Sequence, residues 1–261
     1  MDARDAPAGW QAGRSDAITA RLGAAVMPFG VIVIAVSEYF HPAREDPMDN
    51  PAVFAEYARS NVWTAVHLGE YFGFLLLLGG LVALCYSLRN GPGVGSALVP
   101  FGLAAAVTTA ASYTVLQAVD GITLKRAVDA WARAPADQEL ATFAAAEAVR
   151  WTEIGMNSLS NFLTGLTLLL CGVAVALGRA YPGWVGWIAV LSGALFAYHG
   201  AVVVAYEGFV PSITKLVALA LLAVWSFVMA FFMWRNAGRR GPISRAQATA
   251  PGPAWRATRS R

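Results

Sequence analysis

Long apolar runs dominate the pattern of hydrophobic and polar positions along the chain. Short polar segments separate six such runs, at 21–40, 66–88, 98–119, 154–178, 184–206 and 213–234. About 20 helical residues cross a hydrocarbon core of ~30 Å, and each run reaches about that length. Lipid cannot satisfy backbone hydrogen bonds, and the alternating segments of a membrane barrel are absent from the sequence. The pattern therefore predicts an all-α polytopic bundle of six transmembrane helices.

The connections between the runs predict further local structure. Segments 90–93 and 181–184 combine proline with glycine and predict tight turns. Segment 41–61 contains Asp49 and Pro51, which suit the N-cap and the first turn of a helix. We therefore expect a short interfacial helix in this connection.

The other long connection, 120–150, reads as two amphipathic pieces broken near Pro135, with Asp137 as a candidate cap for the second piece. The ends of the chain are rich in Ala, Gly, Pro and Arg, a composition typical of disordered segments. We therefore expect a disordered tail, a six-helix transmembrane domain and a disordered basic tail, at residues 1–20, 21–236 and 237–261.

Composition agrees with a membrane protein. The chain is 57% hydrophobic and only 13% charged, whereas soluble domains carry roughly 25% charged residues. Lipid must therefore be the solvent for much of the chain, and the lipid bilayer is its expected partner. A nucleic-acid partner is not expected, and two cysteines exclude a disulfide framework.

Charge predicts the orientation. The two tails, the two tight turns and the adjoining arginines Arg21, Arg89, Arg179 and Arg235 carry a formal net charge of +9, and the rest of the chain carries −6. Basic residues stay on the cytoplasmic side of bacterial membrane proteins. We therefore expect a multi-pass protein of the bacterial inner (plasma) membrane with both termini in the cytoplasm.

The polar residues of the spans gather toward the outer side of this topology. All three histidines lie in the outer half, and so do the five acids in or at the ends of spans. Helical spacing aligns many of these residues with Asn and Tyr on single faces of the first five spans. Ionisable groups at membrane depth usually face the bundle interior or a water-filled cavity, so these faces are expected to meet. The candidate ligand-binding residues are His67, Glu70, His199, Glu153, Asn157, Asn161, Tyr113, Asp120, Glu38, His41 and Glu207.

Three hypotheses account for this cluster. Hydrogen bonding between helices explains the Ser and Thr positions, but it explains three histidines and five acids poorly. A metal or haem site would use His and carboxylate ligands, and Glu38 and His41 have the Glu-x-x-His spacing of di-iron bundles; the second motif is reversed, at His67 and Glu70. An outward-open cavity for a small ligand, a proton or an ion explains both kinds of residue.

We take the binding of a small ligand or ion in an outward-facing polar cavity as the expected function. A membrane-embedded enzyme that uses a metal or acid–base chemistry on a lipidic substrate is the first alternative, and a structural or partner-binding membrane protein is the second. No signature of a serine hydrolase, a P-loop, a dinucleotide site or a zinc protease is present in the sequence. The identity of any cofactor, the presence of a metal and the oligomeric state stay open.

Several short motifs resemble those of a known group of proteins. They are Glu38-Tyr-Phe-His-Pro42, Trp63…His67…Glu70, Ala145-Ala-Glu-Ala-Val-Arg-Trp151, Asn157…Asn161 and Tyr206-Glu-Gly208. With them, residues 20–235 resemble uncharacterised six-helix membrane proteins common in actinobacteria, and the chain is similar in layout to domain-of-unknown-function family 4386. The resemblance implies a six-helix fold and carries no established activity.

Overall fold

The computed structural model describes residues 8–239, and every regular element in that range is helical. In chain order the elements are α1 (Ala8–Tyr39), α2 (Asn50–Arg59), α3 (Trp63–Leu88), α4 (Val94–Ala97), α5 (Val99–Ala118), the π-helix η2 (Val119–Leu124), α6 (Lys125–Ala132), α7 (Glu139–Leu177), α8 (Gly183–Tyr198), the π-helix η3 (His199–Val204), α9 (Ala205–Glu207) and α10 (Ile213–Arg239).

Six stretches are long and apolar enough to cross a membrane, which confirms the six predicted spans. They are Ser15–Tyr39, Trp63–Leu88, Val94–Ala132, Glu139–Leu177, Gly183–Glu207 and Ile213–Ala237. The third combines α4, α5, η2 and α6, and the fifth combines α8, η3 and α9.

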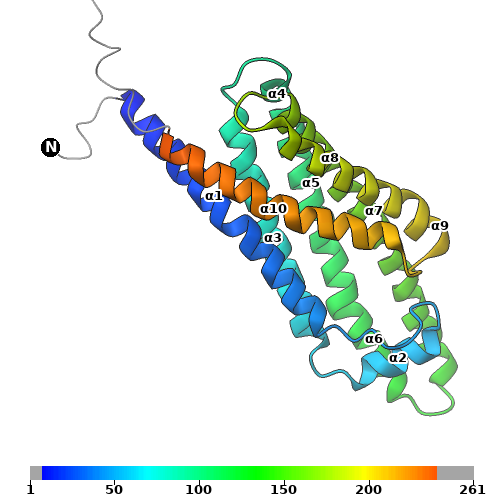
Figure 1. Ribbon diagram of the computed structural model, residues 1–261. Helices are drawn as coiled ribbons and strands as arrows, with labels where there is room; N and C mark the ends of the chain where they lie inside the picture. The colour runs from blue at the N-terminus through cyan, green and yellow to red at the C-terminus, as the bar shows by residue number, and fades with distance from the viewer. Residues whose placement is uncertain (1–7, 240–261) are drawn as a thin grey trace, which may run out of the picture.

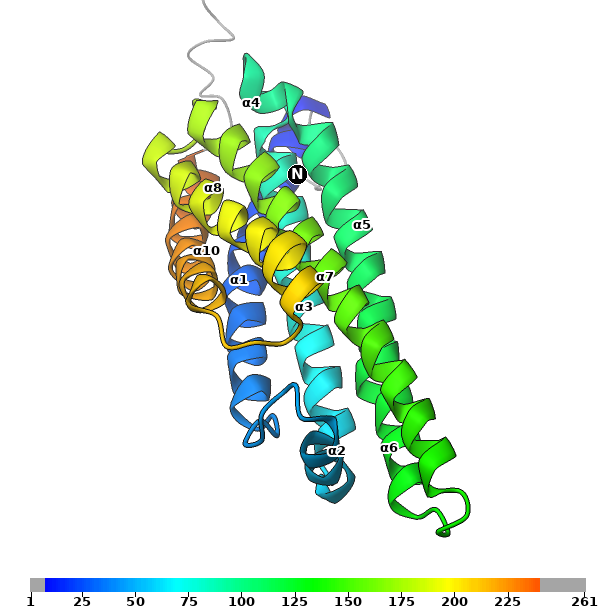
Figure 2. The same cartoon turned by 90° about the vertical axis from the view of Figure 1, so that its right-hand side faces the viewer.

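The six long helices form a closed ring in chain order (Figures 1 and 2). α3 packs against α1 and α5, α7 packs against α5 and α8, and α10 closes the ring against α8 and α1. An even number of crossings returns the chain to the side where it began. The first turns of α1 and the last turns of α10 therefore lie at one end of the bundle, the terminal end, and α2 and α6 lie at the other, the cap end.

Glycine brings two pairs of helices into backbone contact. A Cβ atom on Gly30 of α1 would lie 2.4 Å from the carbonyl oxygen of Gly73 of α3. On the other side of the ring, a Cβ atom on Gly165 of α7 would lie 2.4 Å from the backbone nitrogen of Ala197 of α8. In lipid, helices associate through close packing of small residues because no hydrophobic force drives them together. The α1–α3 and α7–α8 seams therefore hold two walls of the ring.

Apolar side chains from all six long helices fill the inside of the ring. The largest of them are fully buried: Met27, Leu77, Leu81, Leu84, Leu168, Trp225, Met229 and Met233. The ring is therefore a packed core rather than an open pore over this part of its length.

The cap end extends beyond the membrane-sized part of the bundle. α7 has 39 residues and is about 58 Å long, nearly twice the ~30 Å of a hydrocarbon core. Figure 2 shows its first turns projecting together with α6. We call α2, η2, α6 and the first half of α7 the cap. A second apolar cluster holds it together: Val53, Phe54, Tyr57, Trp63, Leu124, Val128 and Ala146.

The start of α2 confirms a prediction from the sequence. Asp49 is the N-cap, and its carboxylate accepts a hydrogen bond of 3.3 Å from the backbone N–H of Ala52. Proline follows at the first helical turn, where its missing N–H leaves no bond unmade. The position of this helix at a membrane interface stays a prediction.

Two predicted boundaries are wrong. Asp137 does not cap α7: a turn closed by the N–H of Gln138 and the carbonyl oxygen of Pro135, 2.8 Å apart, leaves Gln138 at the cap position without a side-chain bond. The break near Pro135 itself is confirmed. Residues 8–20, assigned to a disordered tail, belong to α1, and an ion pair of 2.6 Å between Asp16 and Arg89 fixes this turn to the end of α3.

The other tail boundary also moves, because α10 continues to Arg239. The predicted disorder of residues 1–7 and 240–261 falls outside the described residues.

Candidate functional site

His67 of α3 is almost fully buried, and its two ring nitrogens meet different groups. Nδ1 is 2.8 Å from the backbone carbonyl oxygen of Trp63, and Nε2 is 3.2 Å from Oδ1 of Asp120. A carbonyl oxygen only accepts, so Nδ1 carries a hydrogen and donates it to Trp63. In a neutral ring, Nε2 would then set a lone pair against a carboxylate oxygen. The arrangement therefore favours a proton held between His67 and Asp120.

A π-helix brings Asp120 to this position. In η2 the backbone is wound more widely than in an α-helix, and such segments are frequent at functional sites. Trp63 Nε1 donates a hydrogen bond of 3.1 Å to the carbonyl oxygen of Asp120, and Thr64 Oγ1 donates one of 3.1 Å to that of Gly121. A Cβ atom on Gly121 would lie 2.6 Å from Cβ of His67, so glycine is required for this approach.

Glu70 lies one turn after His67 on α3 and faces Gln117 of α5. Gln117 Nε2 donates a long hydrogen bond of 3.4 Å to Oε2 of Glu70. Glu70 Oε1 and Gln117 Oε1 are buried, and neither has a hydrogen-bond partner among the described residues. A buried acceptor oxygen without a donor is unfavourable. These two oxygens can therefore accept hydrogen bonds from a further donor or from a protonated group.

His41 lies beside His67, just after the end of α1. The centroid of its ring is 5.1 Å from that of His67 and 5.1 Å from that of Trp63. Burial lowers the pKa of His41, because the charged imidazolium loses hydration, and the neighbouring His67 lowers it further. His41 is therefore the uncharged base of the pair.

A second charged group lies on α7, in the cap. Arg150 Nη1 donates hydrogen bonds of 2.9 and 2.8 Å to the two carboxylate oxygens of Glu153, and both side chains are 3% exposed. Arg150 Nη2 donates to the carbonyl oxygen of Pro47, at 3.0 Å, and the guanidinium lies 4.7 Å from the ring centroid of Phe209. This one residue therefore ties the α1–α2 and α9–α10 connections to α7.

Tyr57 of α2 completes the contact between the two groups. Its ring lies 3.9 Å from that of Trp63 and 5.6 Å from the guanidinium of Arg150. Burial raises the pKa of Tyr57, so its hydroxyl stays protonated.

Two predicted site residues lie elsewhere in the fold. His199 is buried at the start of η3, and among residues 15–237 no hydrogen bond, ion pair or ring contact joins it to His67. Glu207 is exposed at the end of α9.

The remaining predicted residues surround the cluster or lie deeper. Glu38 is exposed one turn before His41. Tyr113 stacks on Phe74, with ring centroids 4.0 Å apart. Asn161 donates a hydrogen bond of 2.6 Å to Asn157 within α7, so these two amides satisfy each other. The structure thus brings His41, His67, Glu70 and Asp120 together.

The sequence interpretation missed Arg150 and the two π-helices. Arg150 had a signal, because it lies three residues before Glu153 and shares its helix face. The two π-helices had no such signal in the sequence. A π-helix adds one residue to a helical turn, and this changes neither the hydropathy of the segment nor its overall periodicity.

Among the described residues, no group of three or more His, Cys, Asp or Glu side chains is placed to hold a metal ion. Comparison with known proteins finds no matching family model, no matching curated protein and no matching solved structure. The chemistry of the cluster is therefore the basis for any functional proposal.

Proposed function

We propose that this membrane protein reversibly binds a proton, or a protonated amine or other hydrogen-bond donor in its place, at the cluster of His41, His67, Glu70 and Asp120. The observation that carries the proposal is the pairing of Nε2 of His67 with Oδ1 of Asp120 at 3.2 Å, while Nδ1 already donates to Trp63. That geometry is favourable only with a proton between the two side chains.

The neighbouring oxygens support the same proposal. Glu70 Oε1 and Gln117 Oε1 are buried acceptors without donors among the described residues, and both lie one helical turn from the His67–Asp120 pair. Acceptor oxygens without donors favour a ligand that brings positive charge or N–H and O–H groups. A proton on Glu70 or a protonated amine meets this requirement.

The charge distribution supports access from the outer side. Arg21, Arg89, Arg179 and Arg235 lie in or next to the parts of α1, α3, α7 and α10 that form the terminal end, and the positive-inside rule assigns that end to the cytoplasm. In this orientation the cap and the cluster below it face outward across a bacterial inner membrane. We propose that the ligand enters from that side, past the α1–α2 connection that carries His41.

Histidine NMR tests the proposal, because the chain has three histidines. The protein is labelled with 15N-histidine, placed in lipid nanodiscs and titrated between about pH 5 and about pH 8. Each ring is assigned from the signal lost in His41→Gln, His67→Gln or His199→Gln. We expect Nε2 of His67 to report a bound proton that is lost in Asp120→Asn. Addition of ammonium or methylammonium chloride should shift His67 and His41 and leave His199 unchanged.

The opposite result has a clear form. If Nε2 of His67 bears no proton at any pH, and neither Asp120→Asn nor either cation shifts its signal, the cluster binds neither a proton nor a cation. The polar residues then serve only to join helices, as in the structural hypothesis.

A second candidate is acid–base catalysis on a lipidic substrate. The observation that favours it is the neutral His41 next to the proton-bearing His67–Asp120 pair, since an uncharged base beside an acid is what such chemistry requires. Incubation with a total lipid extract, followed by mass spectrometry, tests it. A lipid converted by the wild type and not by His41→Gln would support catalysis, and identical lipid profiles would contradict it.

A further inference from the structure

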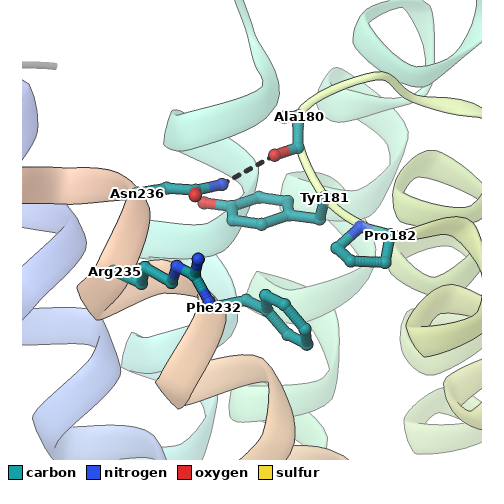
Figure 3. A pocket seen from close by; sticks show the side chains of 6 residues that line it. All are labelled: Ala180, Tyr181, Pro182, Phe232, Arg235 and Asn236. Carbon is teal, nitrogen blue, oxygen red and sulfur yellow. Dashed lines mark hydrogen bonds between the residues drawn. The ribbon is translucent and has the colours of Figure 1, made fainter. Parts of the chain in front are cut away.

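A groove lies at the terminal end, far from the His67 cluster. It has a volume of about 320 Å³ and lies where the α7–α8 turn meets the last turns of α10. Figure 3 shows its lining residues: Ala180, Tyr181, Pro182, Phe232, Arg235 and Asn236. Asn236 Nδ2 donates a hydrogen bond of 2.7 Å to the carbonyl oxygen of Ala180, which holds the two walls together. The groove is therefore a fixed feature of the fold, within the size range of small-ligand pockets.

One wall of the groove carries an unneutralised charge. Arg235 is exposed, its side chain extends between Asn236 and Phe232 in Figure 3, and no ion pair or hydrogen bond joins it to any described residue. Asp16 is the one acid at this end among the described residues, and it is already paired with Arg89. An anion bound to Arg235 would thus meet no carboxylate of the protein there.

The other wall is apolar and continues onto the lipid-facing surface. The ring of Phe232 contacts that of Trp184 edge to face, with centroids 6.2 Å apart. Trp184, Trp187 and Trp234 are each more than half exposed near this end of their helices. Exposed tryptophans mark the level of lipid headgroups. The groove therefore has a cationic side and an apolar side at the depth where a phosphate meets its acyl chains.

We propose that this groove binds the headgroup of an anionic phospholipid such as phosphatidylglycerol. The phosphate pairs with the guanidinium of Arg235, the Pro182–Tyr181 turn and Asn236 border the headgroup, and an acyl chain lies along Phe232 and Trp184. Basic pockets between helices are a known means of holding such headgroups. The site is independent of the functions proposed for the cap end, neither of which needs Arg235.

Native mass spectrometry of the detergent-purified full chain tests the proposal, with phosphatidylglycerol and phosphatidylcholine added in parallel. We expect retention of phosphatidylglycerol over phosphatidylcholine, and a loss of about tenfold in Arg235→Gln, since a charge-assisted bond is removed. Arg179→Gln is the matched control, because it removes the same charge at the same end outside the groove. Arg235→Lys should restore part of the retention.

Three results would overturn the proposal. Equal loss in Arg179→Gln and Arg235→Gln means diffuse attraction instead of a site. Equal retention of phosphatidylcholine means that the groove does not distinguish an anionic headgroup from a zwitterionic one. Displacement of phosphatidylglycerol by inorganic phosphate alone means a site for free anions. A thermal unfolding curve for each variant, matched to the wild type, separates these results from misfolding.

Discussion

The two ends of the bundle are built on opposite principles. Toward the terminal end the ring is packed with Met, Leu and Trp side chains, and its charges are exposed arginines and Asp16, which pairs with Arg89. Toward the cap end, charged and polar groups are themselves buried: His67, Glu70, Arg150 and Glu153 are each less than a tenth exposed. Burying a charge is unfavourable unless it is paired, so the buried charges of the cap end lower the free energy of unfolding. That contrast separates the half that holds the ring from the half that carries the chemistry.

The contrast can be tested most severely at the buried ion pair of the cap. Arg150→Ala leaves the carboxylate of Glu153 buried without its partner, and we expect a loss of about 3–5 kcal/mol in unfolding free energy. The double variant Arg150→Met with Glu153→Leu removes both charges and should recover most of that loss. Unfolding in detergent, followed by circular dichroism, measures both. A double variant as unstable as the single one would show that Arg150 acts mainly through Pro47 and Phe209.

A smaller effect is expected from the glycine seam in the membrane half. A methyl group on Gly165 meets the backbone of α8, so Gly165→Ala should cost about 1–3 kcal/mol. Gly155→Ala is the matched control on the same helix, since nothing lies within 4 Å of its Cβ position. It should be neutral or gain roughly 0.5–1 kcal/mol, as glycine in a helix loses more entropy than alanine. Equal effects would mean that close helix contact does not hold this half together.

The smallest expected effect is a pH dependence at the cap end. Because folding lowers the pKa of His41, the unfolded chain binds a proton more tightly there than the folded chain does. Stability is therefore highest above the ordinary histidine pKa of about 6.5. It falls as the pH drops below that value, and the loss is complete below the lowered pKa. His41→Gln should flatten this part of the profile, measured as the midpoint of thermal unfolding against pH; parallel profiles for the two proteins would rule out the contribution.

The sequence predicts the membrane half of this structure well, for a physical reason. Crossing a bilayer demands about 20 apolar residues in one helix, and no other feature of a sequence imitates that pattern. The N-cap of α2 at Asp49 could be predicted equally well, because N-capping is a local hydrogen bond between residues three apart.

The cluster was only half predictable. Residue count along a helix gives the depth of a side chain, so the polar faces that carry His67 and His199 were expected to meet. It does not give the rotation of each helix about its axis, and in the fold no hydrogen bond, ion pair or ring contact among residues 15–237 joins His199 to His67. The two π-helices change that rotation within a span, and they leave no mark in hydropathy. Arg150 was not predicted as a site residue, because a basic residue outside a predicted span is first interpreted as a topology signal and not as the ion-pair partner of an acid.

The closed ring has a consequence for how the chain is made. α1 leaves the ribosome first, and its final neighbour α10 leaves last among the described helices. α1 can join α3 through the glycine seam early, but the face of α1 that packs against α10 lies open to lipid until α10 is made. Closure is thus the final event of biosynthesis in this part of the chain. A ribosome stalled before residue 213 leaves an open five-helix arc. We expect quality-control proteases of the membrane to recognise this incomplete bundle and degrade it.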